Sequence, residues 1–389
     1  MNILFFSRSL PCHTIGGMEL VAWDIAEGLA RRGHRIKIIT TALGESHKDA
    51  CSGTEHLEIE HLADTRPGQY SRQWWKGSRS AYLREKDNFR PDAVFSVSAG
   101  AGSVFPVLDG IPALMQVHGT SFGEFRSKIH SGRFIPIASS VRNLLWIPKD
   151  ITMYRQVQKV VAIGQAVRDA IDHPLFRWAL PENKVTLISN GIDTEMFRPD
   201  NTAREKLREK LAIPMTAKVL VWASRLHRQK GTHLALKAFA DLRRKDIWFL
   251  IIGDGNERRR LERQSCDLGI SNRVLFVGTI KHKDLPEWLN IGDAFVFTSI
   301  RDEGLPLNIL EALSMNLPLV ISEHIASPLE GAKEIYKVNP NDTDVLSQVM
   351  ENAVSSSGGG RSFIEKYYSQ KIMLARYEKL LNELVAGNE

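Results

Sequence analysis

Two glutamates in the last third of the sequence have the clearest chemical potential. Glu303 and Glu311 stand on either side of Gly304-Leu305-Pro306, and apolar residues at helical spacing follow. Proline suits the first position of a helix because its missing N–H has no partner to lose there. The amides around this turn would then face outward and attract an anion, as helix N-termini do. Carboxylates on both sides of such a site could accept hydrogen bonds from hydroxyl groups next to a bound diphosphate.

A second group of charges lies earlier in the same half. Arg225 ends an apolar run, and Lys230 stands five residues later at the start of a helical pattern. Arginine binds phosphate as a planar fork and lysine as a point charge, so the pair could clamp a diphosphate from two sides. An unrelated surface pair is the other interpretation of this spacing.

The first half offers a glycine pair and a histidine. Gly16-Gly17 precedes a helical pattern, and glycines there let a phosphate or a sugar approach backbone N–H groups. His118 follows a strand-like run and could hydrogen-bond a substrate hydroxyl. A tight turn without a ligand and a purely structural histidine are the alternatives.

The elements expected around these residues place them together. Strand-like runs alternate with helical patterns in both halves, which predicts parallel sheets covered by helices on both faces. Ligands bind such sheets at the carboxyl ends of the strands, where these candidate residues fall. The expected strands are 3–7, 35–40, 92–97, 113–117, 159–163, 185–189, 218–223, 247–252, 274–277, 294–298 and 317–321. The expected helices are 19–32, 231–245, 255–268, 284–292, 306–315 and 363–385.

The composition is that of a globular protein in a reducing compartment. The 389 residues suffice for two domains, and 43% of them are hydrophobic. No apolar run reaches the ~18 residues that span a bilayer, and the first residues lack the pattern of a signal peptide. Cys12, Cys51 and Cys266 are far apart, without metal or redox spacing, which favours the cytoplasm. The net charge of +6 is modest, and we expect no nucleic-acid partner.

Several short motifs occur in the order found in one enzyme family. They are Gly16-Gly17-Met18-Glu19, Ser189-Asn190-Gly191-Ile192-Asp193 with Phe197 and Pro199, Gly253-Asp254-Gly255 with Gly278, and Glu303 through Glu311. Together they resemble glycosyltransferase family four over nearly the whole chain. The resemblance implies the α/β GT-B fold, in which two Rossmann-like, doubly wound domains face each other across a cleft. We expect an acceptor-side domain over 1–197, a nucleotide-sugar domain over 198–362, and a helix in 363–389 that crosses back to the first domain.

The resemblance also implies the roles of individual residues. Glu303 and His118 would be catalytic, with Glu303 holding hydroxyls of the donor sugar and His118 contacting that sugar. Two positions depart from the family pattern: Thr298 replaces a proline, and Ile325–Asn341, which includes Glu330, is a loose match. No metal-ligand cluster is present in the sequence, and we expect neither a metal nor another cofactor. The expected donor-binding residues are Gly17, Arg225, Lys230, Gly304, Leu305 and Glu311, with Glu311 on the ribose diol.

The implied activity is retaining transfer of a sugar from a nucleotide-diphosphate sugar, with UDP-sugars favoured. The acceptor would be a glycan or glycolipid in bacterial surface polysaccharide, lipopolysaccharide or glycolipid biosynthesis. A small soluble acceptor is the alternative, and a nucleotide-sugar epimerase or a non-catalytic nucleotide-sugar sensor is a more distant one. The loop Thr279–Lys283 and the surroundings of Glu303 are expected to select the base and the sugar.

Basic and aromatic residues of the first half suggest a membrane partner. Tryptophan favours the headgroup layer, and each lysine or arginine near an anionic surface contributes about 1 kcal/mol. We therefore expect peripheral contact with the inner face of the cytoplasmic membrane; packing of these aromatics inside the first domain is the alternative. The residues concerned are Arg72, Trp74, Trp75, Lys76 and Arg79, and then Phe122, Phe125, Arg126, Lys128, Arg133, Phe134, Arg142, Leu144, Leu145 and Trp146.

Overall fold

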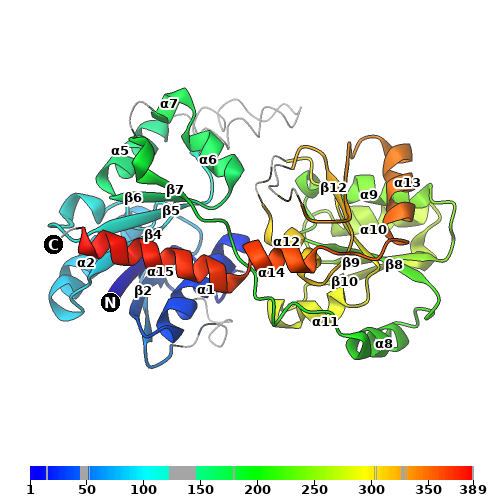
Figure 1. Cartoon of the computed structure of the whole chain (residues 1–389), viewed down its shortest axis with the longest axis horizontal. Coiled ribbons are helices and arrows are strands. Elements are labelled where there is room, and N and C mark those ends of the chain that lie inside the picture. Colours follow the sequence, from blue (N-terminus) through cyan, green and yellow to red (C-terminus); the bar gives the residue numbers. More distant parts are fainter. Residues whose placement is uncertain are drawn as a thin grey trace. The chain divides into compact units, whose positions relative to one another are not determined.

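The computed structural model describes residues 1–14, 16–43, 51, 53–121, 146–177, 180–301, 303, 305–325, 329 and 331–387. These residues divide into two compact units, one made of 1–190 with 370–387 and the other of 191–369. Each unit is a parallel sheet with helices packed around it (Figure 1), as the sequence predicted. We expected boundaries at 197/198 and 362/363, whereas residues 191–197 and 363–369 group with the second unit.

The described part of the first unit contains a seven-stranded sheet. Its strands are β1 (Asn2–Phe6), β2 (Arg35–Thr41), β3 (Leu57–Leu62), β4 (Ala93–Val97), β5 (Ala113–Val117), β6 (Lys159–Ala162) and β7 (Val185–Leu187). They lie in the order β3-β2-β1-β4-β5-β6-β7, and neighbouring strands are parallel. The ring of Phe5 in β1 stacks on that of Phe95 in β4, with centroids 4.2 Å apart, which joins the two central strands.

The helices of this unit are α1 (Gly17–Arg31), α2 (Arg72–Asn88), α5 (Ile147–Gln156), α6 (Gln165–Ile171), α7 (Pro174–Arg177) and α15 (Gln370–Ala386). Strand β3 and helix α2 were not expected. Strand β3 was missed because Glu58 and Glu60 interrupt its apolar pattern at the edge of the sheet. Helix α2 begins at a serine cap, since the side chain of Ser71 accepts a hydrogen bond from the amide of Trp74 at 3.1 Å.

Trp74 is a core residue of the first unit. Its side chain is fully buried, and its Nε1–H donates to the carbonyl oxygen of Gly100 at 3.0 Å. Trp75 is partly buried and stacks on Tyr70 with ring centroids 5.0 Å apart. The expectation that both indoles meet a membrane is therefore wrong for Trp74, because α2 turns it toward the sheet. Most of the second expected membrane group, 122–145, lies outside the described residues.

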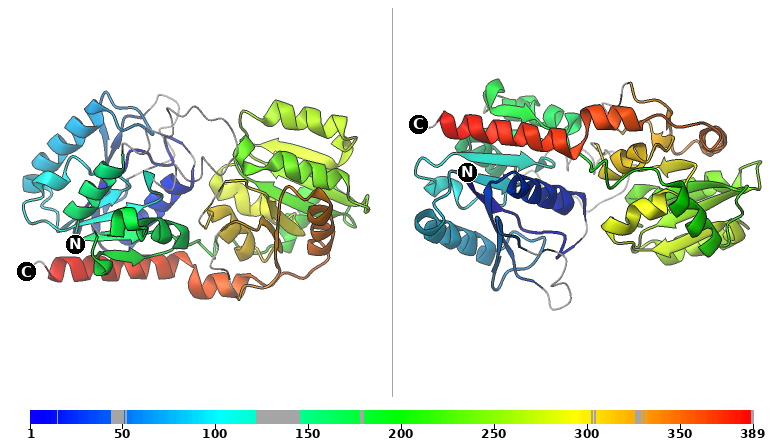
Figure 2. Two further views of the ribbon diagram at one scale, coloured as in Figure 1. Left: turned by 90° about the horizontal axis from the view of Figure 1, so that it is seen from above. Right: turned by 60° about the horizontal axis from the view of Figure 1, so that its bottom comes forward.

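The helix expected at 363–385 is two helices. Helix α14 (Arg361–Tyr367) belongs to the second unit and α15 to the first. Helix α15 lies along α1 (Figure 2), and Gly28 of α1 permits the approach, since a Cβ there would lie 2.4 Å from Cδ1 of Leu374. Arg32 Nη1 also binds Glu378 Oε2 at 2.6 Å. The predicted buried face of this helix is confirmed for Met373, Leu374, Tyr377, Leu380, Leu381 and Leu384.

The described part of the second unit contains a six-stranded parallel sheet. Its strands are β8 (Lys218–Ala223), β9 (Ile247–Ile252), β10 (Val274–Gly278), β11 (Ala294–Phe297), β12 (Leu319–Ser322) and β13 (Ile335–Val338), in the order β10-β9-β8-β11-β12-β13. Its helices are α8 (Asn201–Lys210), α9 (Thr232–Ala240), α10 (Arg258–Asp267), α11 (Leu285–Leu289), α12 (Leu307–Ser314), α13 (Thr343–Ala353) and α14. The expected strands 218–223 and 247–252 are confirmed at both ends, whereas β13 was not expected.

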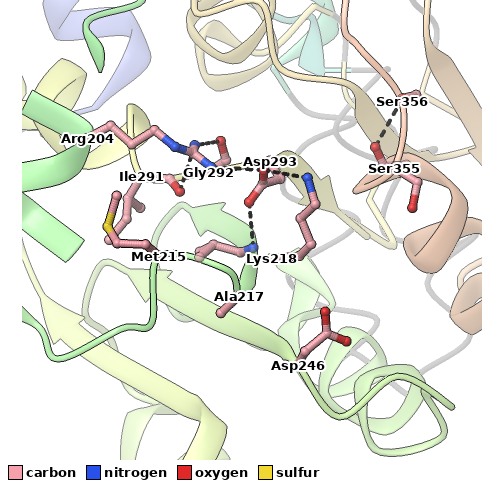
Figure 3. Close-up of polar contacts among 12 residues, drawn as sticks. Arg204, Met215, Ala217, Lys218, Asp246, Ile291, Gly292, Asp293, Ser355 and Ser356 are labelled. Atoms are coloured by element: carbon pink, nitrogen blue, oxygen red, sulfur yellow. Dashed lines mark hydrogen bonds and ion pairs between the residues drawn. The ribbon is translucent and has the colours of Figure 1, made fainter. Parts of the chain in front are cut away.

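Helix α8 was also not expected, and its contacts explain why. The side chain of Asp200 caps it by accepting from two amides of its first turn. Arg204 binds Asp293 at 2.9 Å, and Lys218 reaches the same carboxylate at 3.3 Å (Figure 3). Arg208 also binds this carboxylate, at 2.9 Å. Because these partners are distant along the chain, the local residue pattern does not reveal the helix.

Candidate active site

Each sheet reverses its strand order at one place, and the loops there hold the candidate residues. The reversal falls between β1 and β4 in the first sheet and between β8 and β11 in the second. In open α/β sheets, ligands bind beside the carboxyl ends of the strands at this switch point. These ends lead into Arg8 and Ser98 in the first unit, and into Arg225 and Ser299 in the second.

In the second unit the loop after β8 packs directly against the loop after β11. Gly231 has a φ of +75°, and a Cβ there would lie 1.8 Å from the carbonyl oxygen of Thr298. Thr298 Oγ1 in turn donates to the carbonyl oxygen of Gly231 at 2.9 Å. The threonine that replaces the family's proline thus ties the two loops together, which proline could not do because it has no side-chain donor.

Lys230 and Glu303 form an ion pair at this edge. A short 3-10 turn, Arg228–Lys230, puts Lys230 Nζ 2.6 Å from Glu303 Oε1, and Ser299 Oγ donates to the same oxygen at 3.0 Å. The lysine and glutamate side chains are 19% and 16% exposed, so their attraction is stronger than it would be in bulk water. An ammonium and a carboxylate held in this way can bind phosphate oxygens and sugar hydroxyls, respectively.

Glu311 is nearly buried on α12 and is bonded to His282. Its Oε1 lies 2.9 Å from His282 Nε2, and only 4% of the residue is exposed. Helix α12 is anchored because Asn308 Nδ2 donates to the carbonyl oxygen of Ala223, at the end of β8, at 2.9 Å. We had not predicted His282 as a site residue, although it lies in the loop Thr279–Lys283 expected to select base and sugar.

The other predicted site residues of the second unit differ in how far they are exposed to solvent. Arg225 is exposed, the side chain of Leu305 is buried, and Gly304 lies outside the described residues. Helix α12 begins at Leu307, and Pro306 is its N-cap; the expectation that the proline is the first helical residue is wrong by one position. The structure therefore brings the predicted lysine and the first predicted glutamate together, while the donor-binding roles of all these residues stay predictions.

His118 follows β5 and belongs to a chain of hydrogen bonds in the first unit. Its Nε2 lies 2.9 Å from Gln116 Oε1, and Gln116 Nε2 donates to the hydroxyl of Tyr377 in α15 at 2.8 Å. Since an amide oxygen only accepts, Nε2 carries the imidazole proton and Nδ1 is left as an acceptor. Burial, together with the charge of Arg8, lowers the pKa of His118 to about 4. The imidazole is therefore neutral near pH 7 and able to accept a hydrogen bond from a sugar hydroxyl.

The sequence analysis missed two residues at the switch point of the first sheet. The guanidinium of Arg8 lies over the ring of Tyr70, 4.4 Å from its centroid. Ser98 has a φ of +50°, a left-handed conformation that is strained for residues other than glycine and is common at functional sites. Arg8 was passed over because it stands alone between the first strand and the glycine pair, with no motif around it.

The glycine pair makes room for a carboxylate. Helix α1 begins at Gly17, and a Cβ on Gly16 would lie 2.5 Å from Glu19 Oε2. Glu19 is 8% exposed and folds back toward the start of its helix, where negative charge is favourable. The donor-binding role of Gly17 stays a prediction.

Cys12 and Cys51 are neighbours in the first unit. The amide of Cys12 donates to Cys51 Sγ at 3.2 Å, and the hydrogen bond between the two thiols lowers the pKa of Cys51. The fold therefore brings together two cysteines that are 39 residues apart in the sequence.

The described residues contain neither a cluster of metal ligands nor a helix that could span a membrane. In these ranges no three His, Cys, Asp or Glu side chains gather as metal ligands. Every helix in the same ranges is too short or too polar to cross a lipid bilayer. The expectation of activity without a metal stays a prediction.

Two protein-family models match successive parts of the chain. The model "Glycosyltransferase Family 4" matches residues 15–196, and the model "Glycosyl transferases group 1" matches residues 203–368. With two doubly wound units and both matches, the chain belongs to the family 4 glycosyltransferases.

Named relatives and solved structures agree with this assignment. The chain is 25% identical over 324 residues to an alpha-D-kanosaminyltransferase of Streptomyces kanamyceticus, covering 78% of this chain and 81% of the relative. A sucrose-phosphate synthase of Thermosynechococcus elongatus has a similar fold, with 17% identity, a TM-score of 0.81 and 99% of each chain covered. So does the Anabaena protein HepE in complex with UDP-glucose, with 20% identity, a TM-score of 0.72, and 99% and 100% of the two chains covered. The predicted GT-B fold and glycosyltransferase class are confirmed.

Proposed function

We propose that the protein transfers a sugar from a nucleotide-diphosphate sugar to an acceptor hydroxyl, with retention of anomeric configuration and without a metal ion. The observation that carries the proposal is the ion pair of Lys230 and Glu303 at the switch point of the second sheet, with Nζ and Oε1 2.6 Å apart. It offers a cation for phosphate and a carboxylate for sugar hydroxyls at one place. A UDP-sugar is the first candidate, and the UDP-glucose complex of the structurally similar HepE supports it. Retention depends on the family resemblance.

In the proposed reaction the bond between sugar C1 and the diphosphate oxygen breaks, and the acceptor oxygen bonds to C1. The diphosphate leaves with added negative charge, and the acceptor proton passes to it or to water. Lys230 and Arg225 would supply positive charge where the negative charge develops, because preorganised donors stabilise such transition states. Glu303 would hold hydroxyls of the donor sugar, Glu311 the ribose diol, and His118 would accept from a donor-sugar hydroxyl.

A donor screen tests the first part of the proposal. A ligand at 100 times its dissociation constant adds about 2.7 kcal/mol of stability, so UDP-, GDP-, ADP- and dTDP-sugars can be compared by thermal shift. We expect the largest shift with a UDP-sugar and a smaller one in Lys230→Met. Lys237→Met, which changes an exposed lysine of α9, should respond like the wild type. The absence of a shift with all four donors would refute donor binding.

Product analysis tests the stereochemistry and the metal requirement. An axial donor should give an axial product by NMR, and transfer should be unchanged in EDTA. An equatorial product would overturn retention, and loss of transfer in EDTA that magnesium restores would overturn metal independence.

For the acceptor we propose a glycan or glycolipid held at an anionic membrane face. With Trp74 buried, this proposal now depends on Arg72, Lys76 and Arg79, which are exposed at helical spacing on α2. Each such cation contributes about 1 kcal/mol near an anionic surface. A small soluble acceptor remains the second candidate, which the names of the kanosaminyltransferase and the sucrose-phosphate synthase favour.

Vesicle co-sedimentation distinguishes these acceptors. Binding should require anionic lipid, fade with salt, and be lost in the triple variant Arg72→Glu/Lys76→Glu/Arg79→Glu. The control is Arg259→Glu/Arg263→Glu, which reverses two exposed cations of α10 in the second unit. Equal recovery in the supernatant with and without anionic vesicles at low salt would refute the membrane proposal.

A further inference from the structure

Arg8 carries a positive charge that the described part of the chain does not neutralise. Its Nε–H is buried and meets no hydrogen-bond acceptor there, and Arg8 takes part in none of the ion pairs of these residues. Leaving a buried donor unmet destabilises a fold, and a bound ion or ligand that supplies the missing partner is one explanation for such a donor. Arg8 also stands at the switch point of its sheet, where open α/β sheets bind ligands.

The structure holds Arg8 in a defined position. Its carbonyl oxygen accepts from Thr41 Oγ1 at 2.9 Å and from the amide of Gly68 at 3.4 Å. Its guanidinium lies over Tyr70, 4.4 Å from the ring centroid, and that ring stacks on Trp75. A guanidinium on an aromatic face keeps its planar fork oriented, which suits bidentate binding of two oxygen atoms.

Arg8 shares the carboxyl edge of the first sheet with a neutral side chain, His118, which follows β5. The charge of Arg8 contributes to lowering the pKa of His118 to about 4, after the larger effect of burial, so the imidazole responds to charge at Arg8. His118 is the residue assigned to the donor sugar. A cation at the same edge of the sheet is suited to a negative charge carried by the second substrate.

We infer that Arg8 binds an anionic group of the acceptor, a phosphate or a carboxylate, at the switch point of the first sheet. The inference depends on the proposed function, because it takes the acceptor of the transfer as the ligand. A phosphorylated sugar, a uronic acid and a lipid-linked phosphate share this chemistry, and arginine binds all three as a fork.

Inorganic phosphate is the first probe, and the imidazole resonances of His118 are the readout. At constant pH and ionic strength, replacing chloride by phosphate should shift these resonances saturably in the wild type. The shift should vanish in Arg8→Gln and be weaker in Arg8→Lys, which keeps the charge and loses the fork. It should persist in Lys230→Met, because phosphate binding in the second unit is a separate event. No saturable shift in the wild type, or the same shift in a folded Arg8→Gln, would overturn the inference.

The second probe is a set of three anionic acceptors: a sugar phosphate, a uronic acid and a lipid-linked phosphate. Each is compared with the corresponding neutral acceptor. Arg8→Gln should raise the KM for the preferred anionic acceptor by about 10- to 100-fold and leave the KM for the donor unchanged. The form with the largest change identifies the source of the anion. If Lys230→Met slows transfer as expected while Arg8→Gln changes no acceptor KM, the proposed function stands and the anion subsite is wrong. If no nucleotide sugar is used, the proposed function fails, and the phosphate titration still decides the role of Arg8.

Discussion

The carboxyl edges of the two sheets present their charges in opposite ways. In the second unit, Lys230 pairs with Glu303 at 2.6 Å and Glu311 with His282 at 2.9 Å. In the first unit, Arg8 has no such partner among the described residues. Both sheets are parallel and doubly wound, so the difference comes from the loops and not from the fold.

The edge of the second sheet with Lys230–Glu303 and Glu311–His282 (the paired edge) and the edge of the first sheet with Arg8 (the unpaired edge) suit different ligands. A nucleotide-diphosphate sugar carries hydroxyls as well as phosphates, so it can exchange hydrogen bonds with both members of each pair in the second unit. An unpaired arginine suits a ligand with one localised negative charge. The comparison predicts that variants of the paired residues act on donor use, whereas variants of the unpaired Arg8 act on acceptor use.

The largest effect is expected at the cation of the paired edge. Lys230→Met removes positive charge from the place where the leaving diphosphate gains negative charge, and kcat should fall about 100- to 1000-fold, as for loss of one preorganised donor. Steady-state transfer with saturating donor measures it, with Lys237→Met of α9 as the control. Glu303→Ala should also mainly lower kcat, and the double variant should be non-additive because the side chains touch. A Lys230→Met enzyme with wild-type kcat would show that the pair is structural.

A smaller effect is expected at the buried carboxylate of the same edge. Glu311→Ala removes a charged hydrogen-bond acceptor. A hydrogen bond to such a group contributes about 1.5–3 kcal/mol, so donor use should weaken about 10- to 100-fold. The effect should appear in donor kcat/KM and leave the acceptor KM unchanged. Glu262→Ala is the control, because Glu262 is a glutamate of α10 that pairs with Arg258 away from the switch point. Equal donor kcat/KM in the two variants would remove Glu311 from the site.

The central strands were predictable because a strand buried on both faces appears in the sequence as a short, continuous apolar run. Strands β5, β8 and β9 match the expected ranges at both ends, since each is a run of apolar residues between polar turns. The edge strand β3 was missed because half of it faces polar surroundings, and α8 because distant partners stabilise it.

Site residues that belong to a sequence pattern were predictable, whereas residues whose role depends on contacts formed only in the fold were not. Lys230 was predicted from its spacing to Arg225 and Glu303 from its motif, and the fold then brought the two side chains together. His282 and Arg8 belong to no motif, and their contacts depend on residues elsewhere in the chain. Gln116 was hidden in an apolar strand, where a single polar residue gives no periodic signal.

The smallest effect is expected from the chain of hydrogen bonds behind His118. Tyr377→Phe removes the hydroxyl that accepts from Gln116 Nε2 at 2.8 Å, one hydrogen bond of about 0.5–1.5 kcal/mol. Transfer should fall about 2- to 12-fold, and nitrogen NMR should show a mixture of imidazole tautomers in place of the Nε2–H form. The control is Tyr82→Phe, which removes a buried hydroxyl that donates to the carbonyl oxygen of Leu108 at 2.8 Å. If both variants slow transfer equally and keep the His118 tautomer, the chain through α15 has no role beyond stability.

The pH dependence of stability and of donor use gives a further test of the role of His118. The folded pKa of His118, about 4, lies below its ordinary value of 6.5, so at pH values between them the unfolded chain binds a proton that the folded chain does not. The stability that this neutral imidazole contributes is present above pH 6.5 and is lost as the pH falls toward 4, and His118→Gln should flatten that part of the stability profile. Gln116→Glu places a carboxylate at Nε2, which favours the charged imidazole and raises the pKa of His118. Because a protonated Nδ1 cannot accept from a sugar hydroxyl, donor use by Gln116→Glu should decline on acidification at a pH where the wild type is still fully active. If donor use by the wild type and by Gln116→Glu declined at the same acidic pH, the neutral state of His118 would not be required for donor binding.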